Sequence, residues 1–594
     1  MSAGTPVVIA APAGECLGWF HEASAPSRSV AVVMCRPLGY EALCSYRTYT
    51  QLAHSLSAAG FDVLRFDYHG TGDSTGGDLD SDRVGAWLGS VESAVAAARE
   101  LSGARDVALF GMRLGATLAL EAAQHIGGVA SMMLWAPCAN GRAFTREMRA
   151  AFASHANAAL ELDGGLEALG TLFTRETLLA LDGLAPATAN APPAKRVLLI
   201  GRDDMPAPGP LPAQLRASGA EVTELVWPGY AAMMAEPHDA KLTPQTLEAI
   251  TAWLSDAHPA FHTTTIAHDA VAPAQGLRNC TVSETPASFG HDGRLFGVLS
   301  QAATPRDERS QTAVLLLNVG GNYRVGPNRV YVKLARDLAA AGYRALRMDV
   351  SGIGDSRLDE GFSSDRMYRG DATADVSAAI DMLLKRGCTR IFLLGICSGA
   401  YLAFQTALQD TRVNGQVIIN ARLLEWDADK HGPWQSSMQQ YYKSTRYYRQ
   451  ALLHGDVYAR LLRGEVDVRG IARRLRHLAA ARVRRLVDRI IGRPPQEGVL
   501  AKMKHLCGRG VDTLVTMSEQ DDGLDYMEFH LGTRGAGMRG HANFRMELVP
   551  DADHTFSTVA GQRALTRIVR EHLDGLHAQA EPAVSGLAPP VAIT

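Results

Sequence analysis

Two residues in the second half of the chain have the types and the order needed for covalent acyl chemistry. Cys397 stands at the centre of the pentapeptide 395–399, Gly-Ile-Cys-Ser-Gly, and His554 follows it far downstream. Acyl transfer through an enzyme intermediate needs a nucleophile, a base that takes its proton and an acid that orients the base. We therefore predict that Cys397 is the nucleophile and that His554 is the general base.

The residues around Cys397 predict a sharp turn that would expose its thiol. An apolar run at 391–394 has the length of a buried strand, and residues 400–409 have the pattern of a helix. Glycines two residues on either side of the cysteine would let neighbouring backbone approach closely. The alternative interpretation is a buried structural cysteine in an ordinary strand-to-helix turn.

The pentapeptide resembles the nucleophile elbow of the α/β-hydrolase superfamily, with cysteine in place of the usual serine. The resemblance implies the chain order nucleophile, acid, histidine, with the acid just beyond a late strand. Asp521 fits that place best, and Asp522 and then Asp525 are the alternatives. Asp553, beside the histidine, is expected to shape its turn.

The same resemblance implies an oxyanion hole made of backbone N–H groups. One is expected from Ser398 and the second from the segment 318–322, where we favour Gly321. Arg324 and Arg329 follow closely, and two roles remain open for them. They could bind a substrate carboxylate or phosphate, or they could pair with Asp349 or Asp355.

An internal repeat shows that the chain contains the same unit twice. Residues 52–74 align without gaps to residues 334–356, and 13 of the 23 positions are identical. The pentapeptide 111–115, Gly-Met-Arg-Leu-Gly, corresponds to 395–399. Each copy alternates strands and helices, which predicts an α/β fold with a mainly parallel sheet covered by helices on both faces. The expected fold is two tandem α/β-hydrolase domains.

The expected boundaries are a first domain at 1–257, a linker at 258–279, a catalytic domain at 280–577 and a disordered tail at 578–594. A hairpin is expected within 280–298. The other expected strands lie at 29–35, 62–66, 106–110, 130–135, 196–200, 221–226, 313–318, 344–349, 390–394, 415–419, 512–517 and 545–549.

Arginine stands at the predicted elbow of the first copy. The guanidinium of Arg113 is always charged and cannot attack an acyl carbon, so this copy is expected to be non-catalytic. Here the chain resembles exosortase-system-associated hydrolases, some of which carry arginine at this place, and residues 37–41 and 46–49 carry the same likeness. Arg113 is expected to pair with Glu41, either as a purely structural ion pair or beside a pocket that binds an anion. The late histidine of the superfamily is missing, and His238 is the one substitute.

A long insertion at about 421–510 is expected to form a helical lid over the second site. Apolar residues at helical spacing within 471–490 support this. Residues 441–493 hold 14 Lys and Arg against 4 Asp and Glu, an excess of 14 − 4 = 10 positive charges. This is either a solvated face or a dock for an acidic carrier protein or a coenzyme A phosphate. The aromatic side chains expected at its entrance are Tyr441, Tyr442, Tyr447, Tyr448, Trp426 and Trp434.

Composition excludes several classes of function. The chain has 594 residues with 59 Lys and Arg against 62 Asp and Glu, which does not indicate a nucleic-acid-binding protein. No export signal or membrane-spanning run is visible, so we expect no membrane insertion and a cytoplasmic location. The eight cysteines form no C-x-x-C pair, which argues against zinc and against a disulfide framework, and we expect no cofactor.

These observations predict an enzyme that cleaves an ester or a thioester through an acyl intermediate on Cys397. The expected substrate is a small-molecule or carrier-protein-bound acyl group. One alternative is an acyltransferase that passes the acyl group to an amine or an alcohol. The other is a non-catalytic binding or scaffold protein, and the sequence leaves the oligomeric state open.

Overall fold

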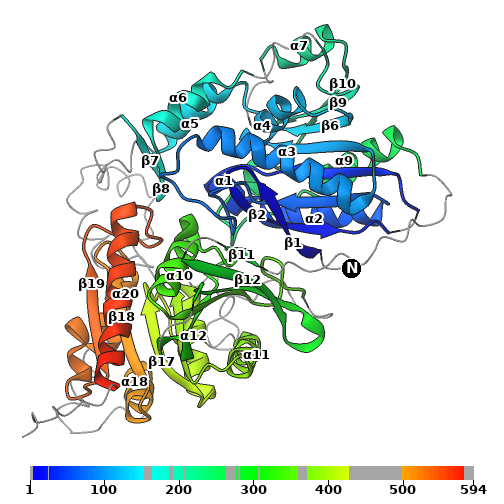
Figure 1. Cartoon of the computed structure of the whole chain (residues 1–594). Coiled ribbons are helices and arrows are strands. Elements are labelled where there is room, and N and C mark those ends of the chain that lie inside the picture. The colour runs from blue at the N-terminus through cyan, green and yellow to red at the C-terminus, as the bar shows by residue number, and fades with distance from the viewer. Residues whose placement is uncertain are drawn as a thin grey trace, which may run out of the picture.

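The computed structural model contains two sheets, each from one half of the chain (Figure 1). It describes residues 4–24, 26–152, 164–185, 191–204, 209–260, 276–278, 281–304, 308–358, 371–426 and 498–580. The core of the expected lid, 427–497, and most of the linker and tail lie outside these residues.

The first sheet has eight strands in the order β1-β2-β4-β3-β5-β6-β9-β10. β1 and β2 form an antiparallel hairpin, β2 pairs antiparallel with β4, and the remaining neighbours are parallel. A separate small hairpin, β7–β8, follows the sixth strand. The strands are β1 (Thr5–Ala11), β2 (Gly14–His21), β3 (Val30–Cys35), β4 (Asp62–Phe66), β5 (Asp106–Met112), β6 (Val129–Trp135), β7 (Leu166–Ala168), β8 (Thr171–Phe173), β9 (Arg196–Arg202) and β10 (Glu221–Trp227).

Helices cover both faces of this sheet because its central strands are apolar on both sides. In β3, Val33 packs into the core beneath α3 and α4, whereas its neighbour Val32 packs into the opposite core with α2 and α9. The helices are α1 (Tyr40–Cys44), α2 (Tyr46–Ala58), α3 (Arg83–Ser102), α4 (Leu114–Ala123), α5 (Gly141–Phe152), α6 (Arg175–Gly183), α7 (Leu211–Ala217), α8 (Tyr230–Met233) and α9 (Pro244–Ala257).

The second sheet has nine strands in the order β11-β12-β13-β15-β14-β16-β17-β18-β19 and repeats the plan of the first. Its first three strands are antiparallel, and the pairs from β15 to β19 are parallel. The strands are β11 (Leu277–Arg278), β12 (Val282–Phe289), β13 (Leu295–Ala302), β14 (Thr312–Leu317), β15 (Arg344–Asp349), β16 (Arg390–Ile396), β17 (Val413–Ile419), β18 (Asp512–Ser518) and β19 (Phe544–Val549).

The helices of the second copy also lie on two faces. α11, α12 and α18 share one core with Leu315, and α10 and α20 share the other with Leu316. Four short 3-10 turns complete the described elements, and one of them, η4 (Pro327–Arg329), leads into α10. The helices are α10 (Val330–Ala340), α11 (Ala372–Lys385), α12 (Ser398–Gln409), α18 (Val499–Gly508), α19 (Gly523–Leu531) and α20 (Val559–Ala580).

The two tandem α/β units agree with the predicted fold class, and three details differ from the prediction. The sequence analysis did not identify the β1–β2 hairpin or the β7–β8 hairpin. Part of the expected linker is ordered, because Leu277 and Arg278 form β11. The closing helix continues to Ala580, beyond the expected start of the tail at 578.

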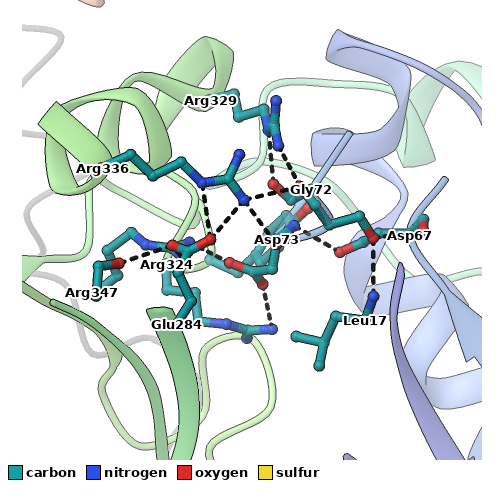
Figure 2. Close-up of polar contacts among 12 residues, drawn as sticks. Leu17, Asp67, Gly72, Asp73, Glu284, Arg324, Arg329, Arg336 and Arg347 are labelled. Carbon is teal, nitrogen blue, oxygen red and sulfur yellow. Dashed lines mark hydrogen bonds and ion pairs between the residues drawn. The ribbon is translucent and has the colours of Figure 1, made fainter. Parts of the chain in front are cut away.

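Equivalent residues of the two copies meet where the copies pack together. Leu17 and Trp19 of β2 form an apolar cluster with Phe296 and Val298 of β13. Around this cluster lie charged residues from both copies, shown in Figure 2. The interface therefore resembles that between two subunits of a symmetric dimer, in which the same surface contributes on both sides.

Ion pairs within the second copy line this interface almost without access to water. Glu284 accepts hydrogen bonds from Arg347 at 2.7 Å and from Arg336 at 2.8 Å (Figure 2). Burial alone would raise the pKa of Glu284, but these two guanidinium groups outweigh it and lower the pKa to about 2. The carboxylate therefore stays ionised at neutral pH.

Candidate active site

Cys397 occupies a strained turn between β16 and α12. Its backbone has φ 56° and ψ −112°, a conformation rare for residues other than glycine. A Cβ at Gly395 would collide with the backbone of Gly399, and a Cβ at Gly399 would lie 2.7 Å from the carbonyl oxygen of Leu317. The two glycines therefore make the turn possible, and the turn lifts the thiol out of the sheet.

The thiol of Cys397 is more accessible than the other described thiols. Among the seven cysteines in the described ranges, Cys397 is partly exposed and the other six are buried. Its alkyl part packs against the core formed by α10 and α20. The interpretation as a sealed structural cysteine does not fit this exposure.

His554 and Asp521 follow neighbouring strands and meet at the same edge of the sheet. Asp521 lies just after β18 and His554 just after β19, and the Nδ1 atom of the histidine contacts Oδ2 of the aspartate. The carboxylate is fully buried, and its Oδ1 accepts a hydrogen bond from the backbone N–H of Gly523 at 2.6 Å. Of the three carboxylates considered as the acid, Asp521 is thus the one that orients the imidazole.

The loop that carries His554 is fixed from two sides. Asp553 accepts a hydrogen bond from the N–H of Ser557 at 2.8 Å, which shapes the turn as expected. Asn420 donates through Nδ2 to the carbonyl oxygen of His554 at 2.9 Å and to Ser518 Oγ at 2.9 Å. The sequence analysis missed Asn420, although its place directly after β17 puts it at the same sheet edge.

The imidazole of His554 also lies close enough to the Cys397 side chain for the two to interact electrostatically. Burial disfavours the imidazolium, but the Cys397 sulfur and the Asp521 carboxylate outweigh it and raise the pKa of His554 to about 9. At neutral pH the ring therefore holds its proton when it faces a thiolate. The imidazole thus lies between the Cys397 sulfur and the buried carboxylate of Asp521.

The expected oxyanion segment lies beside the elbow. The N–H of Gly320 donates to Ser398 Oγ at 2.8 Å, so the loop after β14 contacts the first residue of α12. As the first residue of that helix, Ser398 has no acceptor for its N–H within the helix. A Cβ at Gly321 would lie 2.5 Å from the carbonyl oxygen of Pro237, a residue of the first copy. The first copy therefore packs directly against the predicted oxyanion loop.

The structure describes one of the aromatic residues expected at the entrance. Trp426 packs against Tyr526 and the pair Tyr401 and Leu423. The N–H of Leu424 donates to the Tyr526 hydroxyl at 3.0 Å. Trp434, Tyr441, Tyr442, Tyr447, Tyr448 and the basic segment 441–493 lie outside the described residues.

Arg324 and Arg329 do not lie in this site, contrary to one of the two roles considered for them. Arg324 is fully buried and pairs with Asp73 of the first copy at 2.7 Å (Figure 2). It also pairs with Asp349 at 2.7 Å and with Asp355 at 2.8 Å. Three carboxylates already neutralise it, so binding a substrate anion would break the interface. Pairing with Asp349 and Asp355 is what the structure shows.

Arg329 was expected either to bind substrate or to pair with these aspartates, and it does neither. Its guanidinium reaches the other copy, where Nε donates to the carbonyl oxygen of Gly72 at 2.8 Å and Nη2 to that of Ser74 at 2.7 Å (Figure 2). The sequence could not show this contact because it depends on how the two copies pack.

The elbow of the first copy has the same backbone with different chemistry. Arg113 has φ 54° and ψ −126°, close to the values at Cys397. Its Nε donates to Glu41 Oε1 at 2.7 Å, the expected partner, and Nη2 contacts Glu147, which was not expected. His238 lies 3.4 Å from Asp239 and 3.5 Å from Glu236. The apex therefore holds an ion-paired cation in place of a nucleophile.

The described residues contain neither a metal-binding cluster nor a membrane-spanning helix. Among them, no group of three or more His, Cys, Asp or Glu side chains is arranged to hold a metal ion. None of the helices within the described ranges combines the length and the hydropathy needed to cross a lipid bilayer.

Comparisons with known proteins match the two halves of the chain separately. A family model described as serine aminopeptidase, S33, matches residues 43–168, and the alpha/beta hydrolase family model matches residues 314–568. No curated protein matches the chain.

Solved structures that match are each about half as long as this chain. Est1E from Butyrivibrio proteoclasticus with bound ferulic acid is 12% identical, with 42% of this chain and 98% of that chain covered and a TM-score of 0.32. XC6422 from Xanthomonas campestris, an α/β serine hydrolase without a lid, is 14% identical, with 44% and 98% covered and a TM-score of 0.29. A thermophilic esterase from Thermogutta terrifontis is 17% identical, with 50% and 99% covered and a TM-score of 0.30.

Proposed function

The chain contains two α/β-hydrolase regions in tandem, and on this premise we propose that the second is a cysteine-dependent hydrolase that cleaves an ester or a thioester. The observation that carries the proposal is the position of His554, which interacts with the Cys397 sulfur on the strained turn and contacts Asp521 through Nδ1. Each of the three groups comes from the end of a different strand of one parallel sheet.

The first chemical step forms an acyl-enzyme. The Cys397 thiolate attacks the acyl carbon, and the bond from that carbon to the leaving alkoxide or thiolate breaks. The imidazolium of His554 gives its proton to the leaving group and becomes neutral. Asp521 keeps Nδ1 protonated throughout, so the proton that moves is the one on Nε2.

The second step releases the acid and restores the enzyme. Neutral His554 takes a proton from water, and the resulting hydroxide adds to the acyl carbon while Cys397 leaves as a thiolate. The products are a carboxylic acid and the original thiolate–imidazolium pair. In both steps the N–H groups of Ser398 and of the loop 318–322 are the proposed donors to the oxyanion.

A thiol nucleophile supports thioesters as the first substrates to test. Exchange between a thiolate and a thioester is nearly balanced in energy, and the acyl-Cys397 intermediate stays reactive enough to acylate water, an amine or an alcohol. The proposed donors are therefore acyl groups on coenzyme A or on a carrier protein. The location in the cell remains a prediction from sequence.

The first region is proposed to be non-catalytic. Arg113 replaces the nucleophile, and Glu41 and Glu147 hold its guanidinium. Its contacts with the second region give it a structural role, because Pro237 packs on the loop with Gly321 and Glu167 Oε1 accepts a hydrogen bond from the N–H of Val559 at 2.6 Å.

The test is incubation of the full chain with a panel of acyl thioesters, followed by measurement of free acid and of the intact mass. Hydrolysis predicts release of acid with one acyl group trapped on Cys397 at early times. Cys397→Ala should abolish both, whereas the control Cys388→Ala, at a buried thiol, should keep both.

Two other outcomes would replace this proposal. If acid is released slowly and an added amine or alcohol becomes acylated quickly, the enzyme is an acyltransferase. If Cys397 resists a small electrophile at neutral pH and Cys397→Ala changes no activity, the protein is a binding or scaffold protein.

A further inference from the structure

A partly open cavity of about 310 Å³ lies above the elbow of the first copy, away from the Cys397 site. The second copy supplies part of its wall through Tyr323, Val325, Asn328, Arg329 and Lys333. At about 30 Å³ for each water-sized group, the cavity holds a molecule of roughly ten such groups. It is therefore large enough for a small organic ligand.

Most of the cavity wall is apolar. Side chains from the loop after β3, from α3, from α5 and from the β7–β8 hairpin meet there. Trp87 and Phe173 form one side, and the guanidinium of Arg83 lies over both rings, 5.1 Å and 5.4 Å from their centroids. The other large apolar residues in the wall are Leu38, Leu43, Phe144, Met148 and Val325. Such a wall suits a ligand with an apolar body.

Three cations gather at the end of the cavity that faces the second copy, and they have too few anions. Asp78 is the carboxylate that pairs with two of them, lying 2.9 Å from Lys333 Nζ and 3.8 Å from Arg83 Nη2. Arg329 contacts backbone carbonyl oxygens and, within the described ranges, no carboxylate. Among the described residues, Asp78 is therefore the one carboxylate that makes an ion pair with this group of cations.

Within the described part of the chain, Arg83 has a buried hydrogen-bond donor without a partner at this end of the cavity. Its side chain is 2% exposed, and its Nε has no hydrogen-bond partner among the described atoms. A buried donor without a partner is costly, so such atoms usually mark a strained site or a place for a ligand or water. A carboxylate oxygen near Arg83 would satisfy both its charge and its donor.

The pKa values of Arg83, Lys333 and Arg329 are consistent with this shortage of anions. Burial lowers the pKa of Arg83 and of Lys333, and it lowers the pKa of Arg329 to about 10. All three remain charged at neutral pH. Their positive charges therefore lie in a buried region where neither water nor carboxylates fully neutralise them.

Arg113 also lines the cavity, and its charge is already neutralised. It lies between Glu41 and Glu147, so two carboxylates face one guanidinium. An anionic group would be repelled by these glutamates and attracted to Arg83, Arg329 and Lys333. The charges therefore orient a ligand with its anion toward the second copy.

We propose that this cavity binds a small carboxylate with an apolar body, its carboxylate at Arg83, Arg329 and Lys333. A ligand in this position touches both copies, because Arg83 belongs to α3 and Lys333 to α10. It also touches Asn328, whose Nδ2 lies 3.4 Å from the carbonyl oxygen of Thr555, the residue after His554. The site is separate from the proposed chemistry and does not require it.

The experiment is titration calorimetry of the full chain with octanoate and 3-phenylpropanoate, each compared with its neutral amide and with octylamine. One carboxylate should bind per chain, the amides at least about 10-fold more weakly, and octylamine not at all. Equal binding of acid, amide and amine would show only a nonspecific apolar surface and would overturn the proposal.

Substitutions at residues that line the cavity test whether octanoate binds there. Lys333→Met should weaken octanoate binding about 10-fold, whereas the control Lys502→Met, at a surface lysine paired with Glu425, should not change it. Thr171→Trp, which fills the cavity without removing a charge, should also abolish binding.

His554→Gln separates this cavity from the second site, because it should leave octanoate binding unchanged. Loss of binding in that variant, with Lys333→Met unaffected, would mean that the carboxylate occupies the Cys397 site, and the proposal would be wrong. Melting temperatures of all variants without ligand show whether each one is folded.

Discussion

Arg65 of the first copy forms an ion pair with Asp355 of the second, with 2.8 Å between Nη2 and Oδ1. The mirror-image pair is also present, because Arg347 contacts Asp73. In the aligned repeat 52–74 and 334–356, Arg65 corresponds to Arg347 and Asp73 to Asp355. Each copy thus offers the same arginine and the same aspartate to the other, which is the geometry of a symmetric dimer joined into one chain.

Loss of one interface carboxylate should destabilise the whole molecule. Asp73 is fully buried between Arg324 and Arg347, so Asp73→Asn removes one of the carboxylates that neutralise each of these buried guanidinium groups. We expect a loss of about 3–5 kcal/mol in the free energy of unfolding, measured by urea denaturation. The control Asp204→Asn, at a surface pair with Arg202, should cost under about 0.5 kcal/mol. Equal midpoints for the two variants would contradict this role.

His554 should make stability depend on alkaline pH. Its pKa is about 9 in the folded chain and near ~6.5 in an unfolded one, so folding favours the protonated ring. The resulting stabilisation is complete below about pH 6.5 and is lost as the pH rises through 9.

The measurement for this prediction is the difference in urea midpoint between the wild-type chain and His554→Gln from pH 6 to pH 10. The gap should shrink toward the alkaline end. His505→Gln, at an exposed histidine of α18, serves as the control and should show no such trend. A gap that stays constant with pH would mean that His554 is not protonated in the folded state.

Substitutions in the proposed triad should not add up. Cys397→Ala and His554→Ala should each lower kcat by about 10³-fold or more, and the double variant should be little worse than either. Asp521→Asn should cost less than Cys397→Ala or His554→Ala. Steady-state kinetics on a hydrolysed thioester measures these losses. Additive losses in the double variant would show that the two residues do not act as a unit.

Arg113→Ala should weaken the fold and leave the chemical step nearly unchanged. The change removes the cation between Glu41 and Glu147, and because both glutamates are partly exposed we expect a loss of about 1–3 kcal/mol. Thermal unfolding gives the stability and kcat gives the chemistry, with Arg216→Ala at an exposed pair as the control. A fall in kcat comparable to that of His554→Ala, without loss of stability, would give the first copy a direct part in catalysis.

The sequence predicted the features that depend on local chemistry. The internal repeat predicted two copies of one unit, and the apolar runs predicted β4 and β15 with their observed bounds. The chain order of Cys397, Asp521 and His554 predicted three groups that the structure brings together. Arg324 and Arg329 could not be assigned in the same way. Their partners in the other copy, Asp73 for Arg324 and Gly72 for Arg329, lie more than 240 residues away, and nothing local to an arginine shows how two domains pack.

Glu167, on a hairpin of the first copy, caps the helix that starts just after the His554 loop. The second half of this protein therefore depends on contacts that the first half supplies. Separating the halves would leave the N-terminal end of α20 and the loop with Gly321 uncovered, so the half without a nucleophile serves as scaffolding for the half that has one.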